Sequence, residues 1–116
     1  MNRVTIWHNP RCSKSRTAMQ ILEEYNCETE IIKYLDTNPD VNQIKTILKM
    51  LGITPRELMR QKEILYKEMN LKEENSDDAL ILAMAENPKL IERPIIIKDG
   101  QAIIGRPTEK IAEFLK

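Results

Sequence analysis

The sequence lacks several features that mark broad classes of protein. Lys plus Arg and Asp plus Glu both number 18, so the net charge is zero. Without an excess of basic residues we expect no general binding to nucleic acid or to anionic membranes, and any affinity for anions must be local. No stretch approaches the ~18 apolar residues of a membrane span, and the N-terminus passes into a strand pattern without an apolar signal region. The sequence therefore predicts a cytoplasmic protein.

Cysteine and histidine are also scarce. The two cysteines, Cys12 and Cys27, have neither CxxC nor metal-ligand spacing, and the single histidine, His8, cannot complete a zinc site. We therefore expect no metal, and in the cytoplasm we expect reduced thiols. A chain of 116 residues can bury one hydrophobic core without disulfides, so we expect a single domain over residues 1–116.

The first third of the chain has a β-α-β pattern. The β-branched and aromatic run at residues 4–7 predicts a strand, which Asn9-Pro10 ends. Helical periodicity follows over about Ser13–Tyr25, and residues 29–34 predict a second strand. A helical crossover of this length predicts that the two strands pair in parallel.

Residues from about 38 to 91 are mostly helical in pattern. The stretch Asp36-Thr37-Asn38-Pro39 should end the strand and start a helix with Pro39 near its first turn, and Gly52 should cap the end of that helix. Thr54 and Glu57 form a capping box for the next helix. The segment is too small for a separate domain, and we expect an inserted helical layer that packs against the sheet.

The end of the chain returns to strands. Residues 94–98 and 101–104 flank Asp99-Gly100, a type I′ turn signal, and so predict an antiparallel hairpin. Residues 109–115 predict a last helix. The expected fold is therefore α/β, with a mixed four-stranded sheet and an inserted helical layer.

Cys12 has the surroundings of a reactive thiol. It lies at or just before a helix N-terminus, where unpaired N–H groups and the helix dipole favour an anion. Such placement can lower a cysteine pKa to ~3.5–7.5, and the neighbouring Arg11, Lys14 and Arg16 act in the same direction. Backbone amides of the turn could also hold an oxyanion. Cys27 has no basic neighbours, and we interpret it as a half-buried packing residue.

The segment His8-Asn9-Pro10-Arg11-Cys12-Ser13-Lys14-Ser15-Arg16 resembles the HNPxCxxSR signature of the glutaredoxin-coupled arsenate reductases, a branch of the thioredoxin-like fold. The resemblance covers essentially the whole chain, since Leu58-Met59-Arg60, Glu92-Arg93-Pro94-Ile95 and Gly105-Arg106-Pro107 follow in the expected order. It implies that Cys12 attacks arsenate, that Arg60, Arg93 and Arg106 bind it, and that glutathione and glutaredoxin are the partners. It also implies a cis peptide bond before Pro94.

Several of these residues also carry a signal of their own. Arg93 and Arg106 each precede a proline and flank strand ends near the predicted Cys12 turn, where a planar guanidinium can hold an oxyanion. His8 could assist thiolate formation as a cation or could orient the loop. Ser15 could donate its hydroxyl to the thiolate or cap the helix. Ser15 also stands where a CxxC pair would have its second cysteine, so any disulfide of Cys12 must be with another molecule.

Three functions are compatible with this pattern. We expect an arsenate reductase that passes through an adduct on Cys12 and a glutathione mixed disulfide. Because Arg11, Ser13 and Lys14 replace smaller residues of the better-known members, a glutathione-dependent thiol oxidoreductase with another substrate is an alternative. A redox regulator resembling the Spx proteins is a third, which the absence of a CxxC switch disfavours.

Overall fold

The computed structural model describes residues 3–116. It divides into two compact units, which we describe separately. The sheet unit contains the chain as far as Thr37 together with Arg93–Lys116, and the helical unit is Asn38–Glu92. The expectation of a single domain stays a prediction.

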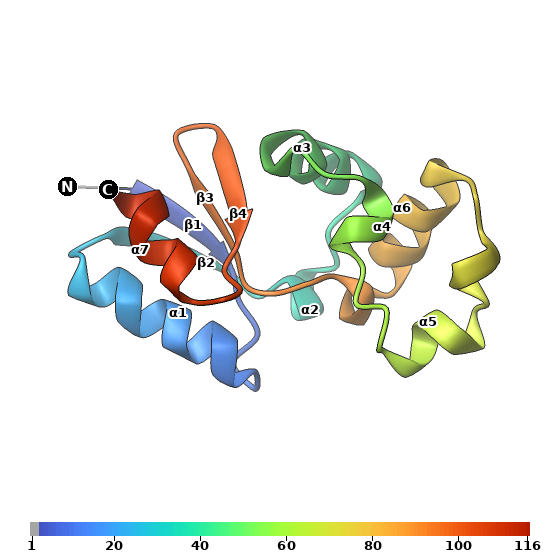
Figure 1. Cartoon of the computed structure of the whole chain (residues 1–116), viewed down its shortest axis with the longest axis horizontal. Helices are drawn as coiled ribbons and strands as arrows, with labels where there is room; N and C mark the ends of the chain where they lie inside the picture. The colour runs from blue at the N-terminus through green and yellow to red at the C-terminus, as the bar shows by residue number, and fades with distance from the viewer. Residues whose placement is uncertain (1–2) are drawn as a thin grey trace. The chain divides into compact units, whose positions relative to one another are not determined.

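The sheet unit contains four strands and three helices (Figure 1). In chain order they are β1 (Arg3–Trp7), α1 (Ser13–Glu24), β2 (Glu28–Ile32), α2 (Tyr34–Thr37), β3 (Ile95–Lys98), β4 (Gln101–Ile104) and α7 (Glu109–Leu115). The strand order is β2-β1-β3-β4, with β1 and β2 parallel and the other pairs antiparallel. This confirms the predicted mixed four-stranded sheet.

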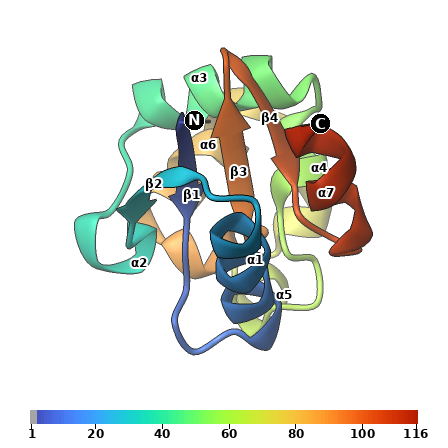
Figure 2. The same cartoon turned by 90° about the vertical axis from the view of Figure 1, so that its left-hand side faces the viewer.

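Helices α1 and α7 cover the same face of the sheet (Figure 2). Because side chains alternate along a strand, β1 presents Val4 and Ile6 to these helices. The core that they close consists of Val4, Ile6, Ala18, Leu22, Ile96, Ile111 and Leu115, all buried. On the opposite face, Trp7 stacks on Tyr34 with ring centroids 6.0 Å apart.

The helical unit contains short helices joined by tight turns. They are α3 (Val41–Leu51), α4 (Pro55–Leu58), α5 (Ile64–Glu68), η1 (Leu71–Glu73), α6 (Asp77–Glu86) and η2 (Pro88–Leu90), where η marks a 3₁₀ helix. The predicted cap at Gly52 is confirmed, since this residue is left-handed with φ 67°. The predicted capping box of Thr54 and Glu57 is also confirmed.

Two predicted boundaries are wrong. Strand β2 ends at Ile32 rather than at residue 34, because Tyr34 begins α2 and stacks on Trp7. Pro39, which we expected near the first turn of α3, lies just before the helix, because Asp40 is the N-cap and forms a capping box with Gln43. Pro39 therefore lies outside the helix.

The C-terminal hairpin has the predicted turn. Asp99 and Gly100 have φ values of 52° and 77°, which are the two positive values of a type I′ turn. The Arg93–Pro94 bond is cis, as the resemblance implied, and the Arg106–Pro107 bond, for which we made no prediction, is also cis.

Candidate active site

The sheet topology brings four chain segments to one end of the sheet. Trp7, the last residue of β1, pairs with Ile32 at the end of β2 and with Ile95 at the start of β3. Ile95 in turn pairs with Ile104 at the end of β4. The turn after β1, Lys33, Arg93 and Arg106 therefore leave the sheet at the same end, which we call the Cys12 end.

The turn between β1 and α1 is held by Asn9. Its carbonyl accepts the backbone N–H of Cys12 at 3.0 Å, and its Oδ1 accepts the N–H of Arg11 at 3.0 Å. This side-chain turn is typical of asparagine. The result is that Cys12 becomes the N-cap of α1 in an extended conformation (φ −94°, ψ 123°), with 8% of its surface exposed.

The sulfur of Cys12 is surrounded by hydrogen-bond donors. Burial by itself raises the pKa of the thiol, but hydrogen bonds from the backbone N–H of Ser15, from the Arg93 side chain and from the N–H of Lys14, together with the Arg93 charge, lower the pKa to about 7. Each of these donors stabilises the thiolate more than the thiol. These donors therefore favour the thiolate of Cys12 at neutral pH more than an ordinary cysteine would.

Arg93 and Arg106 both lie against this sulfur. The Nη2 of Arg106 donates to Cys12 Sγ at 3.5 Å, and its Nε donates to the Arg93 carbonyl oxygen at 2.8 Å. Arg93 also acts on Cys12, yet its Nε and Nη1 are buried without a hydrogen-bond partner. Buried donors without a partner are costly, and a bound anion would satisfy them.

Ser15 is fully buried one helical turn from Cys12. Its hydroxyl oxygen accepts the backbone N–H of Asn9 at 3.3 Å, and its own backbone N–H lies at the Cys12 sulfur. The N-cap of α1 is Cys12, and Ser15 is the third residue of the helix. The geometry thus favours a role in holding the turn, and a catalytic role for the hydroxyl stays a prediction.

His8 is buried at the end of β1. Burial lowers its pKa, and the charges of Lys33 and Arg16 lower it further. The neutral imidazole is therefore favoured at pH 7, which supports the orienting role over the cationic one. Its Nδ1 is buried without a hydrogen-bond partner.

Arg60 belongs to the helical unit and has partners there. Its Nη1 forms an ion pair with Glu63 Oε2 at 3.1 Å and donates to the Lys89 carbonyl at 3.2 Å, while its backbone N–H donates to Leu90. The substrate-binding role implied for Arg60 stays a prediction.

Gly105 supports the position of Arg106, a role that the motif Gly105-Arg106-Pro107 did not reveal. Its N–H donates to the Pro94 carbonyl at 2.8 Å, and a Cβ at Gly105 would lie 3.0 Å from Pro94 Cγ and 3.0 Å from Ile111 Cδ1. Such contacts are too close to tolerate without movement. Glycine is therefore the residue that fits here without displacing Pro94 or Ile111, and it directly precedes Arg106.

The second cysteine lacks these features. Cys27 is half-buried and packs against the core between the sheet, α1 and α7, which confirms the predicted packing position. Burial raises the pKa of its thiol, with a smaller opposing effect from Lys98. Cys27 is thus a weak nucleophile compared with Cys12.

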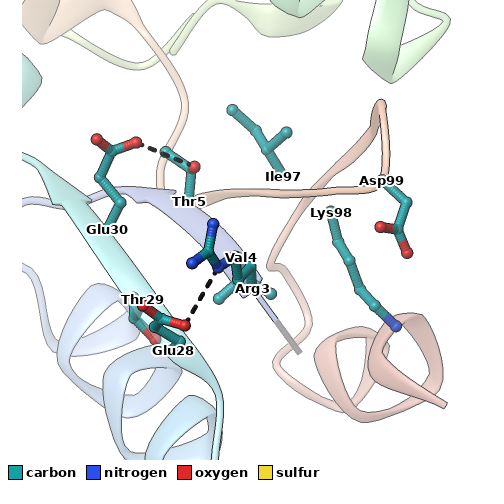
Figure 3. A pocket seen from close by; sticks show the side chains of 9 residues that line it. All are labelled: Arg3, Val4, Thr5, Glu28, Thr29, Glu30, Ile97, Lys98 and Asp99. Atoms are coloured by element: carbon teal, nitrogen blue, oxygen red, sulfur yellow. Dashed lines mark hydrogen bonds and ion pairs between the residues drawn. The ribbon is translucent and has the colours of Figure 1, made fainter. Parts of the chain in front are cut away.

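A pocket of about 430 Å³ lies at the opposite end of β1 (Figure 3). Its charged groups largely satisfy one another, since Arg3 pairs with Glu28 at 3.2 Å and Thr5 donates to Glu30 at 3.4 Å. Lys98 also donates to the Leu115 carbonyl. With most of its polar groups paired and no cysteine in its lining, this pocket is a weaker candidate than the Cys12 end.

Residues 3–116 contain neither a membrane-spanning helix nor a cluster of metal ligands. No helix there is long and apolar enough to cross a membrane. No group of three or more His, Cys, Asp or Glu side chains is arranged to hold a metal ion in the same residues.

Comparison with known proteins defines the class to which this fold and site belong. The model of the ArsC family matches residues 7–114, so the chain belongs to the ArsC family. It is 49% identical to "Arsenate reductase" of Neisseria meningitidis serogroup B over 99% of this chain and 100% of that protein. It is also 51% identical to "Uncharacterized protein YfgD" of Escherichia coli K12, over 97% of each chain.

Solved structures agree with this family assignment. "Arsenate reductase from Vibrio cholerae" superposes with a TM-score of 0.93 at 51% identity, over 97% of each chain. "Putative arsenate reductase from Yersinia pestis" superposes with a TM-score of 0.90 at 49% identity, over 95% of this chain and 98% of that one. The thioredoxin-like ArsC fold implied by the sequence resemblance is therefore confirmed.

Proposed function

We propose that this protein is an arsenate reductase in which Cys12 is the nucleophile. The observation that carries the proposal is a thiol with a pKa of about 7 beside a guanidinium whose Nε and Nη1 are buried and unpaired. A nucleophile and an empty set of anion-binding donors are the two parts that attack on an oxyanion requires. The family and the relatives that bear the name arsenate reductase support the same reaction.

The proposed reaction has three steps. The Cys12 thiolate attacks arsenic, an arsenate oxygen leaves as water, and a sulfur–arsenic bond forms. A glutathione thiolate then attacks the Cys12 sulfur, forming a disulfide, while the electron pair of the sulfur–arsenic bond passes to arsenic and reduces As(V) to As(III). Glutaredoxin attacks the glutathione sulfur, takes over the glutathione and releases the Cys12 thiolate.

The site residues would divide this work. Arg93 and Arg106 would bind the oxyanion and offset its charge during attack, a contribution of about 3–4 kcal/mol for a well-placed donor. His8 and Ser15 would hold the turn that positions Cys12. Arg60 would add a third guanidinium, as the family resemblance implies. The free Cys12 and Cys27 thiols support a reducing cytoplasmic location.

The direct test is to incubate the protein with arsenate, glutathione, glutaredoxin and an NADPH-recycling system and to measure arsenite. We expect arsenite in proportion to NADPH consumed, and none from the Cys12→Ser variant. Rapid reduction of a glutathione mixed disulfide without arsenite would instead identify a thiol oxidoreductase with another substrate.

A further inference from the structure

The first turn of α1 contains basic residues, although the N-terminal end of a helix disfavours cations. It contains Lys14 and Arg16 and no acidic residue. The N-terminal end of a helix has a partial positive charge, so anions stabilise it and cations destabilise it. Helix stability therefore does not explain this choice of residues, and a role outside the helix is the better explanation.

Three exposed cations near the turn have no partner. Among residues 3–116, the side chains of Arg11, Lys14 and Lys33 form no hydrogen bond or ion pair. Arg16 differs, because its Nη1 donates to the Pro10 carbonyl and ties the turn to α1. We call Arg11, Lys14 and Lys33 the unpaired cations.

The unpaired cations belong to chain segments that meet at the Cys12 end. Arg11 and Lys14 flank the cysteine in the chain, and Lys33 directly follows β2 at the Cys12 end, near enough for its charge to act on His8. At the same end, Arg93 and His8 have buried polar atoms without a hydrogen-bond partner. Arg93 and Arg106 already lie at the sulfur, so the exposed cations are free to contact the remainder of a larger anionic molecule.

We propose that the unpaired cations select the thiol co-substrate, favouring a thiol with carboxylates and net negative charge, such as glutathione, over neutral thiols. The inference rests on the proposed function only in taking Cys12 as the sulfur that forms a mixed disulfide. The selected step is attack of the co-substrate thiolate on the Cys12 sulfur. A sulfur–sulfur bond forms, and the bond from Cys12 to its leaving group breaks with its electron pair on that group.

The step can be measured without arsenate. Dipyridyl disulfide converts Cys12 of the Cys27→Ser protein into a pyridyl mixed disulfide, whose uncharged leaving group absorbs when a thiol releases it. The rate is measured with glutathione and with its diester, which lacks both carboxylates. Each rate is divided by the rate of the same thiol with dipyridyl disulfide itself, which removes differences in thiol reactivity. The ratio of the two corrected rates is the charge selectivity.

We expect the protein with Arg11, Lys14 and Lys33 intact to favour glutathione over its diester. The double variant, Arg11→Gln combined with Lys14→Gln, should reduce this selectivity by about two- to twenty-five-fold. An exposed charge pair typically contributes a factor of about 1.4 to 5. Lys33→Gln should give a smaller loss of its own. Raising the ionic strength to about 0.5 M should lower the selectivity of the unaltered protein.

A matched control has the same charge change elsewhere. Arg3→Gln removes an exposed cation at the opposite end of β1 and should leave the selectivity unchanged. The double variant should also keep the Cys12 pKa at about 7, because the groups that lower it are backbone N–H groups and the Arg93 side chain. This separates recognition of the co-substrate from activation of the nucleophile.

The outcomes distinguish this inference from the proposed function. A selectivity near one in the unaltered protein, or a selectivity that the double variant keeps, would overturn the inference even if the protein reduces arsenate. A selectivity that the double variant loses would support the inference even if no arsenite forms.

Discussion

The two ends of the sheet differ in how completely their polar groups are paired. At the N-terminal end of β1, Arg3 pairs with Glu28 and Thr5 with Glu30, and the pocket there is lined by no buried polar side-chain atom without a partner. At the Cys12 end, Arg93 and His8 have buried atoms without partners. Folding stability favours satisfied groups. The unpaired end is therefore the one whose structure is explained by binding and chemistry.

The largest expected effect comes from exchanging the nucleophile. Cys12→Ser should lose all reductase activity, because a hydroxyl is far less ionised than a thiol and cannot form the mixed disulfide. Cys27→Ser should keep most of the activity, since Cys27 only packs against the core. Arsenite formation measures both, and mass spectrometry of the trapped intermediate should find one glutathione on Cys12. A dead Cys27→Ser enzyme with a Cys12–Cys27 disulfide would contradict the mechanism.

Removing a guanidinium should have the next largest effect. Arg93→Ala should lower the turnover rate by about 10²–10³, the typical cost of one donor at a developing oxyanion. It should also raise the Cys12 pKa, since Arg93 lowers that pKa by its hydrogen bond and its charge. Arg93→Lys keeps the charge but not the planar fork and should recover only part of the loss.

The matched control for this change is Arg3→Gln at the paired end of the sheet. It should leave the turnover rate and the Cys12 pKa unchanged. If both variants were equally impaired, the contrast between the two ends would have no functional meaning.

A smaller effect is expected in folding stability. Gly105→Ala should reduce the free energy of unfolding by roughly 1–3 kcal/mol, because its Cβ would press on Pro94 and Ile111. Denaturant unfolding measures this, and Gln101→Ala, on the exposed surface of β4, is the control. The turnover rate should also fall at a denaturant concentration of zero, where the variant is still folded, because the clash displaces Arg106. An unfolding free energy like that of the unaltered protein would show that Gly105 does not hold this position.

Turns and helix caps could be predicted from short stretches of the sequence. The Asp99-Gly100 turn, the Thr54 capping box and the Gly52 cap each depend on a few adjacent residues, and each was predicted correctly. Placement of Arg93 and Arg106 near the Cys12 turn could also be predicted, because strand ends and the residues before proline restrict where these side chains begin.

What the sequence did not reveal depends on contacts between distant segments. The close approach of Gly105 to Pro94 and to Ile111 arises only when β3, β4 and α7 have come together. The same is true of the unpaired Arg93 nitrogens, since no sequence pattern reports which donors lack a partner. The capping box of Asp40 and Gln43, which starts α3, was not recognised in the sequence.

The central claim is that Cys12 is an activated thiolate in a pocket for oxyanions. The most direct measurement is the rate of alkylation of Cys12 by iodoacetamide against pH, in Cys27→Ser protein, with and without arsenate. We predict a midpoint at about pH 7 and slower, competitive alkylation in the presence of arsenate. Because the lowered pKa reflects stabilisation of the folded thiolate, that stabilisation should be complete above the pKa of an unfolded thiol and be lost as pH falls through about 7. A midpoint near ~8.5, the unperturbed value, with no protection by arsenate would contradict the account.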